Sequence, residues 1–258
     1  MGTMNKMHHN IKHYLEAIEK EKQIKILLAC ETGSRAWGFP SPDSDYDVRI
    51  IYMHPKDWYL SLTEKKDSIQ RMLENNEIDI TGWDLRKSLR LLMKSNPPLL
   101  ERIQSTIIYH QNDQFVNSIK ALANNSYSRI STIHHYLSMA KKFLADIVNE
   151  KEYKLKKFFY ALRSATACLW ILKKNEIPPI NFLQMIDGLD INEDLVTRIN
   201  QLISIKSTQS EAYFHKGEPE LFEFIHHCIS FAEAGENSLP SSKIDLVQLD
   251  QFFIKMLD

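Results

Sequence analysis

A short run near the N-terminus constrains this chain more than any other part of its sequence. It places Gly33-Ser34 directly after one apolar segment and Asp45-Tyr46-Asp47 at the start of the next. Side chains alternate between the two faces of a strand, so Asp45 and Asp47 point to the same face. Two neighbouring carboxylates repel each other unless a cation lies between them. The run therefore predicts two strands that present a carboxylate pair to a bound cation.

The turn before the carboxylates indicates a phosphate ligand. Mg²⁺ is a hard ion that proteins hold through one or two carboxylates together with substrate phosphates. Gly33 lets backbone N–H groups approach a phosphate closely, and Ser34 adds a hydroxyl. Ser34 also fits as a plain helix N-cap, and both roles are compatible because helix N-termini bind anions. We therefore expect a site for a metal-bound nucleoside triphosphate.

A third carboxylate is expected from a neighbouring strand, because two metal ions need further ligands. Asp79 is the candidate, since it lies between the aliphatic residues Ile78 and Ile80. It would hold the catalytic metal and accept the proton of the attacking hydroxyl. Asp84 is the alternative, but it precedes an apolar-periodic segment and is interpreted as a helix N-cap.

Several cationic residues accompany these acids. Arg35 follows the turn and either contacts phosphate or forms a surface ion pair. Arg49 lies two residues beyond Asp47 on the same strand face, where it either pairs with a carboxylate or holds a phosphate.

A stripe in the second half of the chain is a further candidate. Lys156, Tyr160 and Arg163 fall at i, i+4 and i+7 and so share one helix face. This stripe either contacts the triphosphate or sugar, or it is an ordinary solvated face. The opposite face is predicted to be a core stripe of Phe158, Leu162, Ala165 and Leu169.

The periodicity divides the chain into an α+β part and an all-α part, predicted as domains 1–112 and 113–258. In the first domain the pattern predicts helices at 11–22, 34–37, 85–94 and 99–104 and strands at 24–30, 46–52, 68–73 and 77–81. In the second domain it predicts helices at 113–124, 126–149, 151–174, 181–187, 191–207, 217–234 and 246–256.

Composition narrows the class of protein. The 258 residues are 43% hydrophobic, which is enough for a sizeable core. A net charge of −1 argues against a wide nucleic-acid surface, although not against binding a single RNA end. Cys30, Cys168 and Cys228 lie far apart in apolar segments and are expected to be buried thiols in a reducing compartment. With no apolar run of roughly 18 residues and no signal peptide, we expect a soluble, cytoplasmic protein without membrane contact.

These motifs, taken together, resemble a known family. The Gly-Ser turn followed by Asp-x-Asp is similar to the DNA polymerase β-like nucleotidyltransferase superfamily. The longer motifs resemble the YcgL/RlaP-type predicted nucleotidyltransferases, and the resemblance covers roughly residues 24–235. The segments that carry it include Gly33–Gly38, Ser44–Arg49, Trp58–Leu62, Gly82–Lys87 and Phe159–Arg163. One departure is Arg102, where the family pattern has tryptophan, and it bears on packing more than on chemistry.

The resemblance implies a polymerase β-like catalytic palm, a small mixed sheet with helices, followed by an all-α C-terminal domain. It implies Mg²⁺ as cofactor, as two ions or with Mn²⁺ in its place, held by Asp45, Asp47 and Asp79. It also implies that Gly33-Ser34 bind the triphosphate, and it favours a nucleotide role for the stripe of Lys156, Tyr160 and Arg163. The family is associated with RNA repair.

The predicted activity is transfer of a nucleoside monophosphate from a nucleoside triphosphate, such as ATP, to an acceptor hydroxyl. The hydroxyl would attack the α-phosphorus, its proton would move towards Asp79, and pyrophosphate would leave. An RNA 3′ end is the family-associated acceptor. The alternatives are a protein hydroxyl, in an AMP- or UMP-adding modifier or antitoxin-like enzyme, a small molecule such as an aminoglycoside, or a non-catalytic nucleotide sensor. The sequence leaves the oligomeric state open.

Overall fold

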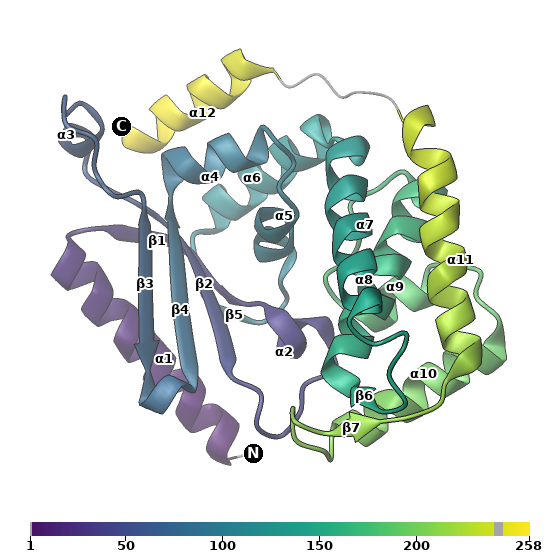
Figure 1. Ribbon diagram of the computed structural model, residues 1–258. Coiled ribbons are helices and arrows are strands. Elements are labelled where there is room, and N and C mark those ends of the chain that lie inside the picture. The colour runs from purple at the N-terminus through teal and green to yellow at the C-terminus, as the bar shows by residue number, and fades with distance from the viewer. Residues whose placement is uncertain (1, 240–244) are drawn as a thin grey trace. The chain divides into compact units, whose positions relative to one another are not determined.

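The computed structural model describes residues 2–239 and 245–258 (Figure 1). Spatial contacts divide the chain into two compact units that interleave along the sequence. The sheet unit contains the chain up to Gly33, then Asp45–Ser126 and the C-terminal helix. The helical unit contains Ser34–Ser44 and the chain from Tyr127 up to the segment that carries the C-terminal helix. The division of the sequence into domains 1–112 and 113–258 stays a prediction.

A five-stranded mixed sheet forms the centre of the sheet unit, in the order β3-β4-β2-β1-β5. Its strands are β1 (Lys25–Glu31), β2 (Tyr46–Met53), β3 (Ser68–Leu73), β4 (Ile78–Asp84) and β5 (Ile108–Gln111). β2 and β4 are parallel, and every other pair is antiparallel. The four predicted strands are confirmed, and the short β5 is an addition that the sequence pattern did not reveal.

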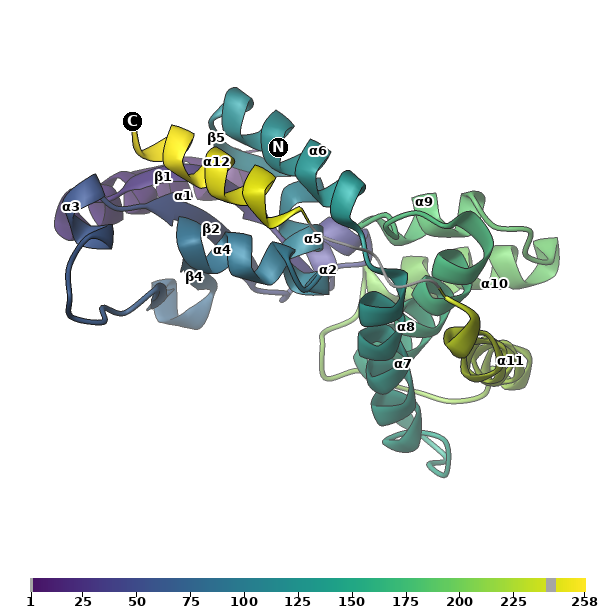
Figure 2. The ribbon, with the colours of Figure 1, turned by 90° about the horizontal axis from the view of Figure 1, so that it is seen from above.

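Helices surround this sheet. They are α1 (Gly2–Lys22), α3 (Lys56–Tyr59), α4 (Leu85–Leu92), α5 (Pro97–Gln104), α6 (Asp113–Ser126) and α12 (Leu246–Leu257), with the 3₁₀ turn η1 (Glu74–Asn76). Ile11, Leu15 and Ile18 of α1 share one buried core with Val48 and Ile50 of β2. Figure 2 shows α12 alongside α4, with which it is in contact.

Local sequence explains where two of these helices begin. Asn96 caps α5 by accepting a hydrogen bond from the Leu99 N–H at 3.1 Å. The helix then begins at Pro97, two residues before the predicted start, because proline suits the first turn of a helix. Asp84 caps α4 in the same way, as predicted.

Arg102, which departs from the family pattern, has a packing role. Its guanidinium lies 3.3 Å above the centre of the Trp83 ring and only 5% of the residue is exposed. Burial lowers the pKa of Arg102 to about 9. Stacking on an aromatic face suits a guanidinium because it is planar and weakly hydrated.

The helical unit is built around one long, buried helix. Its helices are α7 (Arg129–Ala145), α8 (Leu155–Lys174), α9 (Phe182–Asp187), α10 (Glu193–Lys206) and α11 (Pro219–Gly235), with a small β6 (Tyr153–Lys154) and β7 (Phe214–His215) pair and the turn η2 (Glu236–Ser238). The chain enters this unit through α2 (Gly33–Trp37). The predicted core stripe of α8 is confirmed as buried. Phe39, in the loop after α2, joins that core by stacking 4.8 Å from Phe159.

These elements complete an α+β fold, with a mixed sheet and helices first and a mostly helical part afterwards. Cys30, Cys168 and Cys228 are free and buried, as predicted. Within the described residues, no helix has the length and apolar character that a membrane span needs.

Candidate active site

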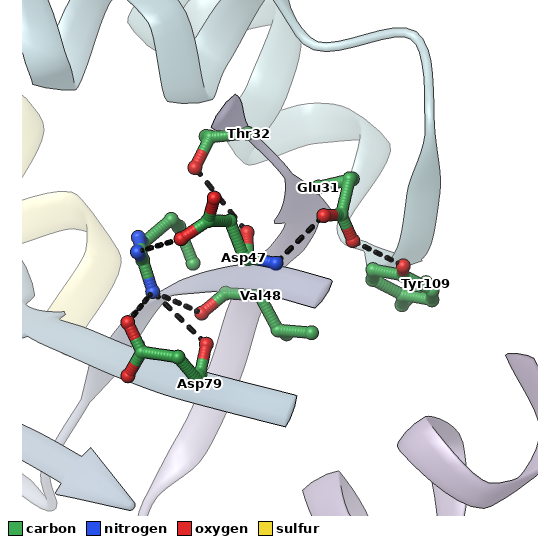
Figure 3. A network of polar contacts seen from close by, with 7 residues as sticks. Glu31, Thr32, Asp47, Val48, Asp79 and Tyr109 are labelled. Carbon is green, nitrogen blue, oxygen red and sulfur yellow. Dashed lines mark hydrogen bonds and ion pairs between the residues drawn. The ribbon is translucent and has the colours of Figure 1, made fainter. Parts of the chain in front are cut away.

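Two of the predicted acids lie side by side on neighbouring strands. Asp47 of β2 is paired with Asp79 of β4 in the parallel register (Figure 3). The residues flanking them, such as Val48 and Ile80, point into the core under α1. Because side chains alternate along a strand, Asp47 and Asp79 therefore occupy the opposite face of the sheet. The arrangement brings one predicted acid from each strand together.

Arg49 joins these two carboxylates. Its guanidinium forms an ion pair with Asp47 and another with Asp79, the latter 2.9 Å from Nη1 to Oδ2. Nη1 also donates to the main-chain oxygens of Asp79, at 2.9 Å, and Val48, at 3.3 Å. The three side chains are only 17–24% exposed, so the pairing is partly shielded from water. One positive charge is thus shared between two negative charges.

The backbone of Asp47 is fixed from β1. Its N–H donates to the Glu31 carboxylate at 2.7 Å, and its carbonyl oxygen accepts from the Thr32 N–H at 2.9 Å and hydroxyl at 3.2 Å. Glu31 is fully buried and also accepts from the Tyr109 hydroxyl (Figure 3). Glu31 was not among the predicted site residues. The feature that could have identified it is an acid at the end of an otherwise apolar strand, because a buried charge needs partners.

Gly33 lies directly against Asp47. Its φ of +61° falls in the left-handed region that glycine tolerates best. A Cβ atom on this residue would be 2.0 Å from Asp47 Oδ2. In the structure Gly33 therefore approaches a carboxylate of the chain itself, and the close approach to a phosphate stays a prediction.

The donor set of this acid pair fits a hard cation. Asp79 Oδ1 is buried and has no hydrogen-bond partner among the described residues. Asp45 lies one residue before β2 and is half-buried. Across residues 2–239 and 245–258, no three His, Cys, Asp or Glu side chains are already gathered as a metal cluster. The strands thus supply two adjacent carboxylates with an unsatisfied oxygen, and oxygen ligands are those that Mg²⁺ prefers.

Asp84 is separated from this pair. It lies at the other end of β4, five residues beyond Asp79, which corresponds to about 17 Å along a strand. Its carboxylate accepts from the Arg86 N–H at 2.8 Å and from the Tyr59 hydroxyl at 2.6 Å. Burial raises the pKa of Asp84. Its oxygens are therefore engaged as a helix cap and a core contact.

Ser34 belongs to a second polar cluster, within the helical unit. Its hydroxyl donates to Ser44 Oγ at 3.1 Å, and the Ser44 hydroxyl donates in turn to Glu211 Oε1 at 2.9 Å. The Arg35 guanidinium donates to the main-chain oxygen of Ser44. Glu211 also anchors the loop through its N–H, which donates to the Asp43 carboxylate at 2.8 Å.

Two lysines complete this cluster. Lys156 Nζ lies 2.6 Å from Glu211 Oε2. Lys206 is 2% exposed and donates to Ser41 Oγ at 2.8 Å, and burial lowers its pKa. Lys206 and Glu211 were missed by sequence reasoning, because their contacts with the loop at 41–44 span more than 160 residues.

The predicted stripe on α8 divides between two environments. Lys156 joins the polar cluster, whereas Tyr160 packs edge-on against Trp37 at 5.1 Å. Arg163 is only 3% exposed, lies 4.4 Å above the Trp37 ring and donates to the main-chain oxygen of Ile180 at 3.1 Å. The stripe is thus not an ordinary solvated face, and its Arg163 end lies in the core.

Comparisons with known proteins identify several that are similar to this chain. The chain is 37% identical to the protein named YcgL of Bacillus subtilis over 232 residues, which cover 90% of this chain and 89% of that protein. It is 23% identical over 135 residues to the tRNA (34-2′-O)-methyltransferase regulator WDR6 of Drosophila melanogaster, covering 52% of this chain and 13% of WDR6. A nucleotidyltransferase-like protein of Exiguobacterium sibiricum is 13% identical with a TM-score of 0.33, covering 95% of this chain and 79% of that one.

A family model described as "RlaP: RNA repair pathway DNA polymerase beta family" matches residues 7–255, nearly the whole chain. The chain therefore belongs to the RlaP family of DNA polymerase β-like nucleotidyltransferases.

Proposed function

We propose that this protein transfers a nucleoside monophosphate from a nucleoside triphosphate to the 3′ hydroxyl of an RNA strand. The observation that carries the proposal is the in-register pair of Asp47 and Asp79, with an unsatisfied oxygen on Asp79. Membership of a family described by RNA repair supports RNA as the acceptor. The acid pair supports metal-dependent chemistry at phosphorus.

Asp45, Asp47 and Asp79 would hold Mg²⁺, which supplies neutralisation of the charge that develops on the phosphoryl oxygens. Asp79 would take the proton of the attacking hydroxyl, and its Oδ1 has no hydrogen-bond partner among the described residues. The acceptor oxygen then forms a bond to the α-phosphorus, and the bond from that phosphorus to the bridging oxygen of pyrophosphate breaks. Glu31 and Thr32 keep the backbone of Asp47 fixed while this happens.

Arg49 has a preparatory role in this proposal. Two bare carboxylates at paired positions repel each other, and its guanidinium removes that repulsion. A divalent cation offers the same compensation with greater charge. Arg49 would therefore exchange its carboxylate contacts for contacts with a phosphate when the substrate complex forms, which unites the two roles that the sequence left open.

Ser34, which was predicted to bind phosphate, lies in the polar cluster of the helical unit, and this cluster would bind an anionic group. Ser34 and Ser44 supply hydroxyls, and Arg35, Lys156 and Lys206 supply positive charge. In the structure a carboxylate, Glu211, takes the donors of Ser44 and Lys156. A phosphate oxygen accepts from the same kinds of donor, so Glu211 would occupy the place of a phosphate in the free protein.

The decisive experiment incubates the purified full chain with Mg²⁺, each α-³²P-labelled nucleoside triphosphate, and a short RNA with a free 3′ hydroxyl. We expect label on the RNA, and a loss of at least about 100-fold in the Asp47→Asn/Asp79→Asn variant. RNA carrying a 3′ phosphate should remain unlabelled.

The matched control is Asp187→Asn/Asp190→Asn, which removes the same charge from two exposed acids of the helical unit. It should retain wild-type activity. Full activity in the Asp47/Asp79 variant would refute the proposal. Label that appears on a protein band instead of RNA would replace the RNA acceptor with a protein hydroxyl.

A further inference from the structure

A polar cleft lies in the sheet unit, away from the acid pair. It is formed by α3, the loop that follows it and α4, and we call it the α3–α4 cleft. Its volume is about 240 Å³. Small-molecule sites usually measure about 300–1,000 Å³, so the cleft suits a fragment of a larger ligand, such as one ring and one phosphate.

The charge of this cleft contrasts with that of the chain. Four basic and three acidic side chains line it, whereas the whole chain has a net charge of −1. Lys65 and Arg90 form no ion pair with any described residue, and both are exposed. Of the lining acids, Asp67 is paired with Lys87 at 2.8 Å and Asp84 is engaged as a cap. Two cations are thus available for an anionic ligand.

The remaining charged residues do not cancel these two. Glu64 is the lining carboxylate that has no ion pair in the described part of the chain. Arg86, one helical turn before Arg90, has no carboxylate partner there either. Its guanidinium lies 4.9 Å above the Tyr59 ring and donates to the Tyr59 carbonyl oxygen at 2.9 Å. Positive charge therefore exceeds negative charge in the cleft, and Arg86 is held in place.

An aromatic surface accompanies these cations. Trp58 lines the cleft and stacks on His54 with ring centres 4.0 Å apart and planes 7° apart. Tyr59 lies 5.0 Å from Trp58, so the indole is supported from two sides. Lys65 Nζ lies 5.8 Å from the Trp58 ring centre. A rigid ring beside free cations is the combination with which proteins bind single-stranded nucleic acid, through base stacking and phosphate contacts.

We propose that the α3–α4 cleft binds single-stranded RNA, with a base against Trp58 and phosphates at Lys65 and Arg90. The inference rests on the proposed function only in taking RNA, rather than another polyanion, as the ligand. Asp84 borders the cleft at about 17 Å along β4 from Asp79.

The test measures equilibrium binding of fluorescein-labelled oligouridine of 3 and 12 nucleotides by fluorescence anisotropy, without nucleoside triphosphate or divalent cation. We expect the 12-mer to bind more tightly than the 3-mer. Lys65→Ala/Arg90→Ala should weaken 12-mer binding at least tenfold at 50 mM salt. It should also reduce the slope of log K against log salt by about 1.4, since each lost phosphate contact removes about 0.7 for single strands.

The control is Lys12→Ala/Lys20→Ala, which removes the same charge from exposed positions on α1. Equal weakening in the two double variants would overturn the inference, because it would show a general charge effect. The inference would also be overturned if UMP displaced the labelled 12-mer as effectively, mole for mole, as unlabelled 12-mer does. That result would show that the cleft binds a free nucleotide. The Lys65/Arg90 variant leaves Asp47 and Asp79 unchanged, so the two proposals can fail separately. If the protein labels RNA but its RNA binding does not depend on the cleft, only this inference is refuted. If RNA binding depends on the cleft but no label is transferred, only the proposed function is refuted.

Discussion

At the scale of single residues, the acid pair shows how the fold prepares a charged site before any ligand arrives. Strand register places Asp47 and Asp79 opposite each other, and the ion pairs with Arg49 reduce the repulsion between the two carboxylates. Breaking a partly buried ion network by removing its cation leaves uncompensated charge, which destabilises the fold.

Replacing Arg49 should therefore reveal the affinity of the site for divalent cations. We expect Arg49→Gln to lower the unfolding free energy by about 1–3 kcal/mol without divalent ions. Added Mg²⁺ should raise the melting temperature of this variant more than that of the wild type, measured by calorimetry. Arg71→Gln removes an arginine from an exposed pair with Glu21 and is the control, with no Mg²⁺-dependent gain expected. An equal response in both variants would contradict a cation site at Asp47 and Asp79.

The cysteines allow a second prediction at this scale. Burial raises the pKa of Cys30 and of Cys228 to about 12, and it also raises the pKa of Cys168. A thiol reacts as its thiolate, so these groups should be inert in the folded protein at pH 8. We expect no reaction with DTNB in native buffer and three equivalents in guanidinium chloride. Rapid labelling of the native protein would show that a thiol is accessible.

At the scale of elements, the turn at Gly33 combines two requirements. It needs a positive φ, and it leaves no room for a Cβ beside Asp47. Gly217 has a φ of +91° but no atom within 4 Å of its would-be Cβ. The two glycines therefore share a positive φ, and they differ in whether a Cβ atom at that position would meet other atoms.

Alanine substitution separates these effects. Gly217→Ala should cost about 1–2 kcal/mol from the left-handed backbone alone. Gly33→Ala should cost more, and it should also abolish transfer activity because Asp47 must move. The measurements are chemical denaturation and the RNA-labelling assay. Equal losses of stability, with activity retained, would show that the contact with Asp47 has no consequence.

The loop at 41–44 leads to a prediction about Glu211. Its carboxylate takes donors from Ser44 and Lys156 that a phosphate would otherwise use. Glu211→Gln keeps the size of the side chain and removes the charge, so the Kd for a nucleoside triphosphate should fall at least threefold in a filter-binding assay. The exposed pair of Lys141 and Glu233 provides the control, Glu233→Gln, which should bind as the wild type does. Weaker binding by Glu211→Gln would assign Glu211 to support of the loop.

The same elements show what the sequence can and cannot predict. The strands β1–β4 and the helices of both units, with the exception of α3, follow from the sequence pattern, and the cap at Asp84 follows from its residue type. To predict that Asp47 and Asp79 lie together, it is enough to place their two strands next to each other in the sheet. β5 could not be predicted from the sequence, because four residues are too few for a periodic signal. The contacts of Glu211 and Lys206 could not be predicted either, because their partners depend on tertiary packing across most of the chain.

At the scale of the whole molecule, the C-terminal helix is part of the sheet unit. Phe253 packs edge-on against Tyr59 at 5.2 Å, and Phe252 stacks on Phe115 at 6.1 Å. Asp258 forms an ion pair with Lys56 at 2.7 Å, although that pair is exposed. The aromatic contacts bury more apolar surface than the ion pair and should dominate the contribution of α12.

Removing residues 246–258 should therefore destabilise the sheet unit. We expect a lower melting temperature and binding of a hydrophobic dye, because Tyr59 and Phe115 lose their cover. Substituting Lys56→Ala alone tests the ion pair and should leave the melting temperature nearly unchanged. A truncated chain that melts like the full chain would show that α12 adds nothing to the fold.

The interleaving of the two units has a consequence for how the protein is made. A ribosome releases the chain from its N-terminus, and a domain usually folds as soon as its last segment has emerged. Here the last segment of the sheet unit follows the helical unit in the sequence. The strands that carry Asp47 and Asp79 are therefore not covered by α12 until residues 246–257 have been synthesised. A nascent chain stalled before residue 246 would already hold every proposed catalytic acid and still lack a finished sheet unit.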